Sequence, residues 1–449
     1  SVLLEAGQAK VYAVGEYHAT RNVKIDKTPL VRFTHSTPPA AGSPRRIGRR
    51  HHGAGCLSIR ARDTGRCGRV DRAGRTGAGT AVRLLDGLGG LGRLGRPRRP
   101  WEPRRPVKVA IVAQRYGEAI NGGAELHARY IAEHLARHIQ VEVLTTCAAD
   151  YVTWRNELPA GVEEIGGVTV RRFPVGHERN PLTFGEQSRQ VFEQRHSAGD
   201  ELRWLDAEGP ASRALITHIR RHASAFDYVI FFSYRYYHAF HGVRAASSRA
   251  ILVPTAERDP AIGLSIFPPI FRGVRALMYN SPEERAMIQS LAGNRDVPSV
   301  VVGIGSDVPA NPQPARFRQK YNIRGPFAVY VGRIDENKGC RELFEFFQAY
   351  LREGTGGLSL ALIGNSLLPI PGDPRIRHLG FLDDADKFDA VAASELLIMP
   401  SYFESLSMVA LEAWALGRPV LANGKCDVLK GQSIRSSAGL YYDDGSEFV

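Results

Sequence analysis

The chain has 449 residues, which exceeds one hydrophobic core of ordinary size and predicts two large domains. Its hydrophobic (43%), aromatic (9%) and charged (23%) fractions are close to globular averages, and no apolar run reaches the length that a spanning helix needs. We therefore expect a soluble protein and exclude an integral membrane class.

The net charge of +13 is concentrated in one segment. Residues 45–105 contain 17 arginines, no lysine and four acids, which accounts for the whole +13 of the chain. The remaining residues are electrically neutral. A neutral body has no broad electrostatic surface for a polyanion, so a nucleic-acid-binding function would depend on the Arg-rich segment alone.

Residues 1–106 are not assigned to a fold. Short strand-like runs at 10–14 and 30–33 are too few to close a core, and 44–106 are rich in Arg and Gly without interleaved aromatics. We expect a largely disordered leader. A misread or fused leader, a genuine flexible tail and an RNA-binding tail remain alternatives.

The compartment is predicted from two observations. The N-terminus lacks a basic region followed by an apolar run, so a secretory signal is not supported. The five cysteines are odd in number, scattered and without a CxxC pair, which favours a reducing compartment and no metal site. We expect a cytoplasmic protein.

From residue 107 short β-branched runs alternate with helix-length segments, which predicts an α/β chain with two doubly wound parallel sheets. The first series of expected strands is 108–113, 141–145, 168–173, 228–232, 250–254 and 276–280. The second series is 299–302, 327–332, 359–363, 396–399 and 419–422. A cluster of Gly, Pro and Asn near 303–314 predicts a domain boundary, which gives domains at 107–308 and 309–449.

A glycine pair follows the first of these strands. Gly122 and Gly123 precede a helical pattern at 124–137, so backbone N–H groups at the helix N-terminus would be open to a phosphate or a sugar hydroxyl. A tight turn without a ligand is an equal alternative.

A basic loop leaves the strand at 327–332. Arg333 offers a planar fork and Lys338 a point charge beyond the carboxyl end of a strand, where open α/β sheets bind ligands. Together they suit a diphosphate, whose charge they would stabilise without a metal ion as the leaving group departs. The alternative is a surface salt-bridge loop with Asp335 and Glu336.

An acidic motif follows the strand at 396–399. Glu404 is expected at a helix entrance and would face a sugar, while the amides of Ser405, Leu406 and Ser407 would be available to an anion. Glu412 would lie on the same helix face as Ser405, about 10 Å along the axis, and would accept hydrogen bonds from ribose. A capping acid plus an unrelated Glu is the alternative.

In order and spacing, the glycine loop, the GRIDxxKG stretch and the E-x7-E element resemble glycosyltransferase family 4 with the GT-B fold, over residues 107–449. The resemblance implies two facing Rossmann-like domains, an acceptor side at 107–308 and a donor side at 309–449. It implies sugar transfer with retention from a UDP- or GDP-linked donor, without a metal or other cofactor. Glu404 resembles the family's catalytic acid.

The chain departs from the family pattern in two places. Many relatives carry a histidine in the segment 253–260, where this chain has Glu257, so the acceptor chemistry is open. After residue 444 relatives usually continue through further helices, so we expect an incomplete second domain.

The sequence leaves three alternative functions open. The first is transfer to a glycan or lipid-linked acceptor, in which the helix at 124–138 offers only a weak electrostatic case for peripheral membrane contact. The second is a catalytically impaired protein that binds the nucleotide sugar, and the third is an Arg-rich nucleic-acid-binding protein. Epimerases and phosphorylases of the same fold are disfavoured by the E-x7-E element.

Overall fold

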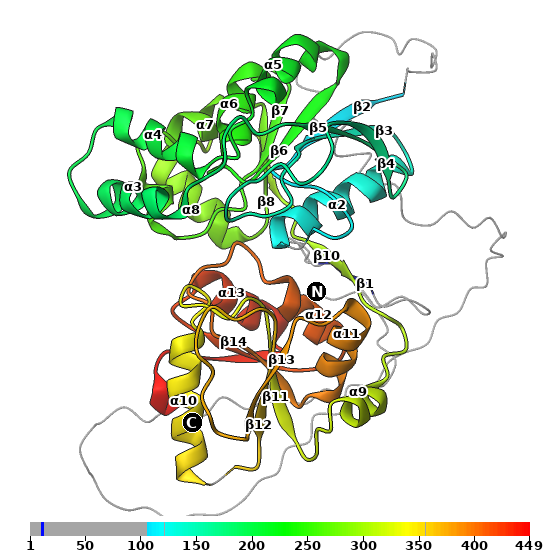
Figure 1. The fold of residues 1–449 in the computed structure, drawn as a ribbon, viewed down its shortest axis with the longest axis vertical. Coiled ribbons are helices and arrows are strands. Elements are labelled where there is room, and N and C mark those ends of the chain that lie inside the picture. Colours follow the sequence, from blue (N-terminus) through cyan, green and yellow to red (C-terminus); the bar gives the residue numbers. More distant parts are fainter. Residues whose placement is uncertain (1–9, 13–105, 121, 355) are drawn as a thin grey trace, which may run out of the picture. The chain divides into compact units, whose positions relative to one another are not determined.

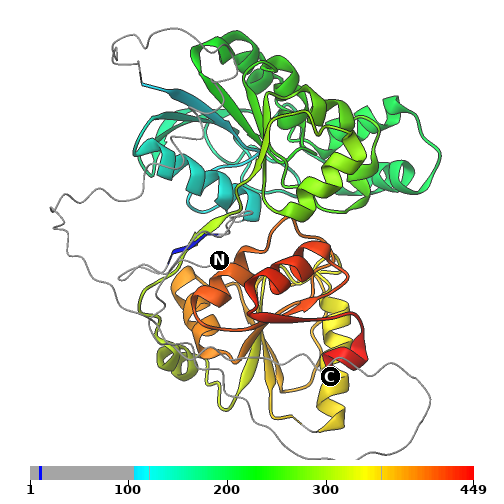
Figure 2. The same ribbon diagram turned by 180° about the vertical axis from the view of Figure 1, so that it is seen from behind.

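The computed structural model describes residues 10–12, 106–120, 122–354 and 356–449, which all belong to one compact unit (Figures 1 and 2). The predictions for residues 13–105 lie outside the described residues. Among the helices that are described, none has the length and apolar character needed to cross a membrane.

The first sheet has eight strands in the order β4-β5-β3-β2-β6-β7-β8-β9. All neighbours are parallel except β4, which pairs antiparallel with β5 at the edge. The strands are β2 (Lys108–Val112), β3 (Gln140–Thr146), β4 (Gly161–Ile165), β5 (Val168–Phe173), β6 (Tyr228–Phe232), β7 (Ala250–Val253), β8 (Ala276–Tyr279) and β9 (Ser299–Val301).

Alternate side chains of this sheet enter two cores, as the two-residue strand period requires. Val109 and Ile111 pack on the α2 side, whereas Ala110 and Val112 pack on the opposite side with α4 to α8. The helices are α2 (Gly123–Ala136), α3 (Pro181–Glu193), α4 (Ala198–Glu208), α5 (Arg213–His222), α6 (Tyr237–Ala245), α7 (Pro268–Gly273) and α8 (Pro282–Ala292).

The second sheet has six strands in the order β13-β12-β11-β14-β15-β16, all parallel. The strands are β11 (Phe327–Val331), β12 (Ser359–Ile363), β13 (Ile376–Gly380), β14 (Leu396–Met399), β15 (Val420–Asn423) and β16 (Gly439–Tyr442). The helices are α9 (Pro314–Lys320), α10 (Cys340–Glu353), α11 (Asp384–Ala393), α12 (Met408–Ala415), α13 (Asp427–Ser436) and α14 (Gly445–Phe448). Separately, β1 (Lys10–Tyr12) pairs antiparallel with β10 (Gly305–Asp307).

Two doubly wound sheets were predicted and are confirmed, with one correction. The strand expected at 299–302 was named with the second series, although the predicted bounds of the first domain, 107–308, include it; β9 pairs with β8 at the edge of the first sheet. The assignment failed because a short apolar run carries no information about which sheet it joins. The strand pattern also missed β4, β10, β13 and β16.

A small apolar cluster connects α2 with α12. Leu406, Met408 and Leu411 are buried there with Ile304, and Leu126 of α2 packs against them. The larger cores of the two sheets are separate from this cluster. This contact between the two parts therefore contains far fewer buried residues than the core of either part.

Candidate functional site

A pocket of about 230 Å³ is lined by residues from both sheet systems. From the eight-stranded part come Gln114, Gly123, Glu125, His127, Tyr234, Arg235, Glu257, Asp259 and Asn280, among others, and from the six-stranded part Lys338, Glu404, Ser405, Leu406 and Met408. Five of the nine predicted site residues therefore share its wall. The others, Gly122, Arg333, Ser407 and Glu412, are not part of the lining.

An ion pair joins two of the predicted residues within the pocket. The Nζ atom of Lys338 donates to Oε1 of Glu404 at 2.7 Å. Burial opposes the charge of Lys338, but Glu404 and Glu257 outweigh it and raise the lysine pKa above its usual value. A cation and a carboxylate that sequence reasoning placed in separate motifs thus meet in one site.

A glycine allows this close approach. Gly339 has φ +69°, and a Cβ atom there would lie 2.0 Å from the carbonyl oxygen of Pro400. Any other residue would push the Lys338 loop away from the segment that leads to Glu404. The glycine of the GRIDxxKG stretch is therefore required by packing as well as by backbone conformation.

Arg333 has partners on both sides of its guanidinium. It donates to Asp335 and to the hydroxyl of Tyr151, a residue that follows β3. Burial tends to lower the pKa of Arg333, but Asp335 and Tyr151 raise it above its usual value. The salt-bridge interpretation of the loop holds for Arg333 and Asp335, whereas Lys338 is directed to Glu404.

The motif around Ser405 differs from the prediction. Helix α12 begins at Met408, so Ser405 precedes it and does not share a helix face with Glu412. Ser407 is the N-cap, and its hydroxyl accepts from the amide of Ala410 at 3.2 Å. The helix therefore starts three residues later than expected, because a serine placed at the cap satisfies a free N–H group.

The amide of Ser407 is not available to an anion, contrary to the prediction. It donates to Oε1 of Gln432 at 2.9 Å, and Nε2 of Gln432 donates back to the Ser407 carbonyl at 3.3 Å. Ser405 and Leu406 remain in the pocket wall, and within the described chain no acceptor contacts their amides. No sequence pattern indicated Gln432, which lies in α13.

Glu412 does not line the pocket. It is buried, with only 2% of its surface exposed. Its Oε1 accepts from the Ser306 hydroxyl at 2.8 Å, and Oε2 lies 3.5 Å from Nζ of Lys387. Burial raises the pKa of Glu412, although Lys387 and Ser306 counteract this. Its role toward ribose stays a prediction.

The glycine pair forms the start of α2 at the pocket, with Gly122 as the N-cap and Gly123 as the first helical residue. Gly123 lines the pocket, and a Cβ on Gly123 would meet no atom within 4 Å. A Cβ on Gly122 would lie 2.2 Å from Oε2 of Glu125, whose other oxygen accepts from Arg115 at 2.6 Å. A side chain at position 122 would therefore collide with the buried ion pair between Arg115 and Glu125. A side chain at position 123 would meet no neighbouring atom.

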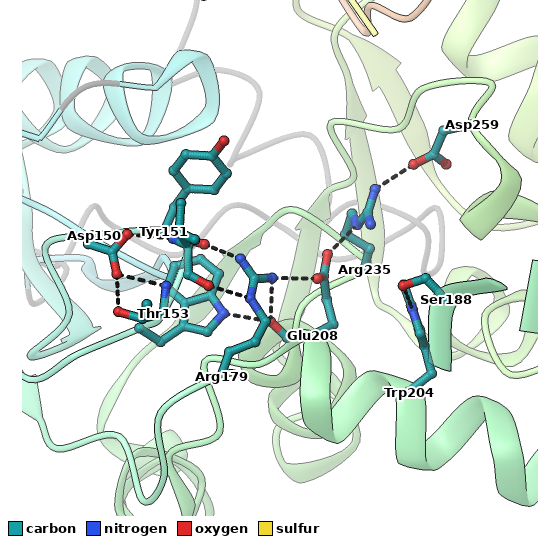
Figure 3. A network of polar contacts seen from close by, with 11 residues as sticks. Asp150, Tyr151, Thr153, Arg179, Ser188, Trp204, Glu208, Arg235 and Asp259 are labelled. Atoms are coloured by element: carbon teal, nitrogen blue, oxygen red, sulfur yellow. Dashed lines mark hydrogen bonds and ion pairs between the residues drawn. The ribbon is translucent and has the colours of Figure 1, made fainter. Parts of the chain in front are cut away.

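Sequence reasoning missed a buried network that ends in the pocket (Figure 3). Arg235 donates to Oε1 of Glu208 at 2.7 Å and also to Asp259, and Arg179 donates to Oε2 of Glu208 at 2.8 Å. Burial disfavours the charge on Arg235, but Glu208 and Asp259 raise its pKa well above the usual value. These residues are scattered along the sequence, so no local motif predicts them.

Glu257 is a partly buried carboxyl in the pocket wall. Burial raises its pKa to about 7, with Glu404 also raising it and Lys338 lowering it. The neighbouring Glu284 accepts from the amides of Ala256 (2.6 Å) and Asn280 (2.5 Å) and, mainly through burial, has a pKa raised to about 8. Burial therefore disfavours the ionised form of both carboxyls.

Comparison with known proteins finds a family model that matches part of the chain. Residues 325–443 match the family model described as Glycosyl transferases group 1. The O-antigen chain mannosyltransferase B of Escherichia coli is 25% identical over 178 residues, which cover 37% of this chain and 43% of that protein. The glycogen synthase of Thermus thermophilus is 32% identical over 115 residues, covering 24% and 26% respectively. The matches thus span less than half the length of these curated relatives.

Solved structures with the same fold cover more of the chain. Sucrose-phosphate synthase from Thermosynechococcus elongatus aligns with a TM-score of 0.55 at 17% identity, over 76% of this chain and 87% of that one. Anabaena Alr3699/HepE in complex with UDP and glucose aligns with a TM-score of 0.52 at 17% identity and the same coverage. At these identities the likeness shows the fold alone.

The predicted resemblance is confirmed at the level of the family model and the fold, whereas assignment to family 4 stays a prediction. The chain has the GT-B fold, and its residues 325–443 match the model of the glycosyl transferases group 1 family.

Proposed function

We propose that this protein is a retaining hexosyltransferase that moves a sugar from a nucleoside-diphosphate sugar to a hydroxyl acceptor. The observation that carries the proposal is the pairing of Lys338 and Glu404 at 2.7 Å in the pocket wall. A cation suited to a diphosphate and a carboxylate suited to a sugar lie in the same site. Residues 309–449 would form the donor side and 107–308 the acceptor side.

The proposed transfer forms one bond and breaks another. The acceptor oxygen bonds to the anomeric carbon of the donor, and the bond from that carbon to the diphosphate oxygen breaks with its electron pair leaving on phosphate. The acceptor proton passes to a phosphate oxygen. Lys338 and Arg333 would stabilise the charge on the diphosphate. Glu404 would act on the developing positive charge of the sugar, as nucleophile or as electrostatic stabiliser.

Relatives support the substrate classes proposed here. Solved structures of Anabaena Alr3699/HepE contain UDP, glucose or UDP-glucose. Curated relatives include an O-antigen chain mannosyltransferase and a lipopolysaccharide core glycosyltransferase. We propose a UDP- or GDP-linked hexose donor and a glycan or lipid-linked acceptor, reached in the cytoplasm with peripheral contact at the membrane.

The first experiment is binding and turnover of UDP-, GDP- and ADP-sugars by the full chain. We expect saturable binding of one donor, with affinity falling about 10- to 100-fold in Lys338→Ala and in Arg333→Ala, because each removes a charge-assisted contact. Arg341→Ala is the matched control, since Arg341 is 62% exposed and pairs with Glu336 two residues before Lys338. A folded protein that binds no donor would refute the proposal.

A second candidate is a nucleotide-sugar-binding protein without transfer activity. It is favoured by Glu257, an acid in the pocket wall where many relatives carry histidine. Such a protein would bind one donor of the panel and release no nucleoside diphosphate from it. The same experiment therefore separates the two candidates.

A further inference from the structure

Two residues of the pocket wall have a backbone conformation that residues with a side chain rarely adopt. Ser233 has φ +62° and Thr255 has φ +48°, in the left-handed region that favours glycine. Of the five non-glycine residues that the structure describes with a positive φ, these are the two that line the pocket. The conformation is most costly for Thr255, because its side chain branches at Cβ.

The two residues lie beyond the carboxyl ends of neighbouring strands. Ser233 directly follows β6, and Thr255 lies two residues after β7, which pairs with β6 in parallel. The Thr255 hydroxyl donates to Oγ of Ser233 at 2.9 Å. Glycine would adopt both φ values without strain, but it could not form this hydrogen bond. The strained conformation therefore accompanies a contact that only side chains provide.

This hydrogen bond joins two loops that carry side chains of the pocket. Ser233 precedes Arg235 by two residues, and Thr255 precedes Glu257 by two. Arg235 also donates to Asp259, which follows Glu257 in the second loop (Figure 3). All of these residues line the pocket. The orientation of Arg235 and Glu257 therefore depends on the two residues at which the loops leave the sheet.

A positive φ can also be an ordinary feature of a turn, as it is at Ser437. That residue has φ +53°, is exposed at the C-cap of α13, and forms no side-chain hydrogen bond with the part of the chain that the structure describes. Ser233 differs because it is 3% exposed and its hydroxyl is paired with that of Thr255. Strain that is kept at a pocket together with such a contact indicates a functional constraint on geometry.

We propose that the strained pair of Ser233 and Thr255 positions the pocket side chains of its two loops for sugar transfer. This inference rests on the proposed glycosyltransferase function and adds two positioning residues to it. They act through Arg235 and Glu257, so their loss slows the reaction. Donor affinity is kept, because the charge of the donor is bound by Lys338 of the six-stranded part under the proposed function.

The test removes the strain and the hydrogen bond together. Thr255→Gly and Ser233→Gly each relax the backbone and delete one hydroxyl, whereas Thr255→Ser keeps the hydrogen bond. The matched control is Ser437→Gly, which relaxes a residue of similar φ that does not line the pocket. The measurement is hydrolysis of the donor by the full chain, with water as the acceptor and the UDP-, GDP- or ADP-sugar that the protein binds.

We expect kcat to fall about 10- to 100-fold in Thr255→Gly and in Ser233→Gly, because small misplacements near reacting atoms slow a reaction strongly. The KM for the donor should stay within about 2-fold, since donor contacts are unchanged. The melting temperature should not fall, because relief of strain offsets the lost hydrogen bond. The double variant should lose no more than either single variant. Thr255→Ser and Ser437→Gly should keep the kcat of the unaltered protein.

Crystal structures of the unaltered protein and of Thr255→Gly test the positioning directly. We expect the side chains of Arg235 and Glu257 to differ in position by about 1 Å or more, the scale of misplacement that affects rates. If Thr255→Gly does not fold, Thr255→Asn takes its place, since asparagine tolerates this φ.

Four results would overturn the inference: superimposable pocket walls, an unchanged kcat in both glycine variants, a loss of kcat as large in Thr255→Ser as in Thr255→Gly, or losses that multiply in the double variant. A protein that binds a donor but releases no nucleoside diphosphate would instead reject the proposed transfer. The two crystal structures would then still decide whether the pair positions the pocket.

Discussion

Glu257 lies in the pocket wall near a lysine and a second carboxylate, and its ionisation depends on both. Lys338 favours the ionised form of Glu257, whereas Glu404 and burial oppose it. The outcome is a pKa of about 7 against the usual 4.5. A carboxyl that binds its proton more tightly in the folded protein than in the unfolded chain makes folding less favourable as the pH rises between those two values.

Replacing this carboxyl gives a pH-dependent stability difference. Glu257→Gln stays neutral, so we expect it to exceed the unaltered protein in free energy of unfolding at pH 8, by up to about 3 kcal/mol. The difference should shrink through pH 7 to 4.5 and vanish near pH 4, where Glu257 is protonated in both states. Urea unfolding across this range measures it.

The control is Glu336→Gln, which changes a carboxyl that is 64% exposed. Its stability difference should stay small, because ion pairs between exposed side chains contribute little. If Glu257→Gln instead gave a constant difference from pH 4 to 8, the carboxyl would not titrate in the range assigned to it.

At the scale of single residues, the sequence indicated some of the charged residues of the pocket, but not the residues that they contact. Lys338 and Glu404 were found because each lies in a compact motif after a strand, and parallel strands bring their carboxyl ends to one edge. Gln114, His127 and Arg235 were missed because each looks ordinary in its own segment. Only the folded chain brings them to the same pocket.

At the element scale, long apolar strands were predicted well and short, half-exposed ones were not. Strands such as β6 and β12 are nearly continuous in buried apolar residues, which the pattern detects. By contrast β4 is almost wholly exposed and β13 mixes buried and exposed positions. The start of α12 was misplaced because its position depends on the Ser407 cap and on Gln432, a partner far away in sequence.

The contact between Ser407, the N-cap of α12, and Gln432 of α13 allows a test of how the start of α12 is positioned. Gln432→Ala would leave the buried amide and carbonyl of Ser407 without their partner, so we expect a loss of about 1–3 kcal/mol in the free energy of unfolding. Donor affinity should fall as well, because the Ser405 and Leu406 segment directly precedes Ser407. Urea unfolding and calorimetry measure the two effects.

The control for this change is Gln319→Ala, a replacement of an exposed glutamine on α9. It should alter neither quantity by more than about 0.5 kcal/mol. Equal effects of the two substitutions would mean that Gln432 does not position the segment.

At the scale of the whole molecule, two separate pairs of cores are linked by a small apolar cluster and a few polar contacts. Arg258 contacts Asp427 at 2.9 Å, but both side chains are more than half exposed, so the pair adds little stability. Asn280 donates to Ser405 at 3.2 Å beside the pocket. Cooperative unfolding of the two sheets as one body is therefore not expected.

We expect two unfolding transitions, which tryptophan fluorescence can separate. Trp154 and Trp204 are buried beside the eight-stranded sheet, and Trp414 lies in α12 and packs against a core of the six-stranded part. In a Trp101→Phe background, Trp414→Phe should remove the signal of one transition and keep the other. Nucleoside diphosphate at about 100 times its Kd should stabilise the transition that Trp414 reports by about 2.7 kcal/mol.

A single transition with every probe would contradict this expectation. So would a nucleotide effect confined to the transition that Trp154 and Trp204 report, because Arg333 and Lys338 both belong to the six-stranded part. Circular dichroism recorded on the same samples shows whether fluorescence follows loss of secondary structure.

The ion pair between Lys338 and Glu404 has a thermodynamic consequence for the two halves of a donor molecule. One ammonium group cannot hold both the carboxylate and a diphosphate at full strength, so under the proposed function a diphosphate would compete for Lys338 and free Glu404. Glu404 would then be available to the sugar only when the nucleotide is bound. We therefore expect nucleotide and sugar to bind with positive cooperativity, and reciprocity requires that each tighten the binding of the other by the same factor.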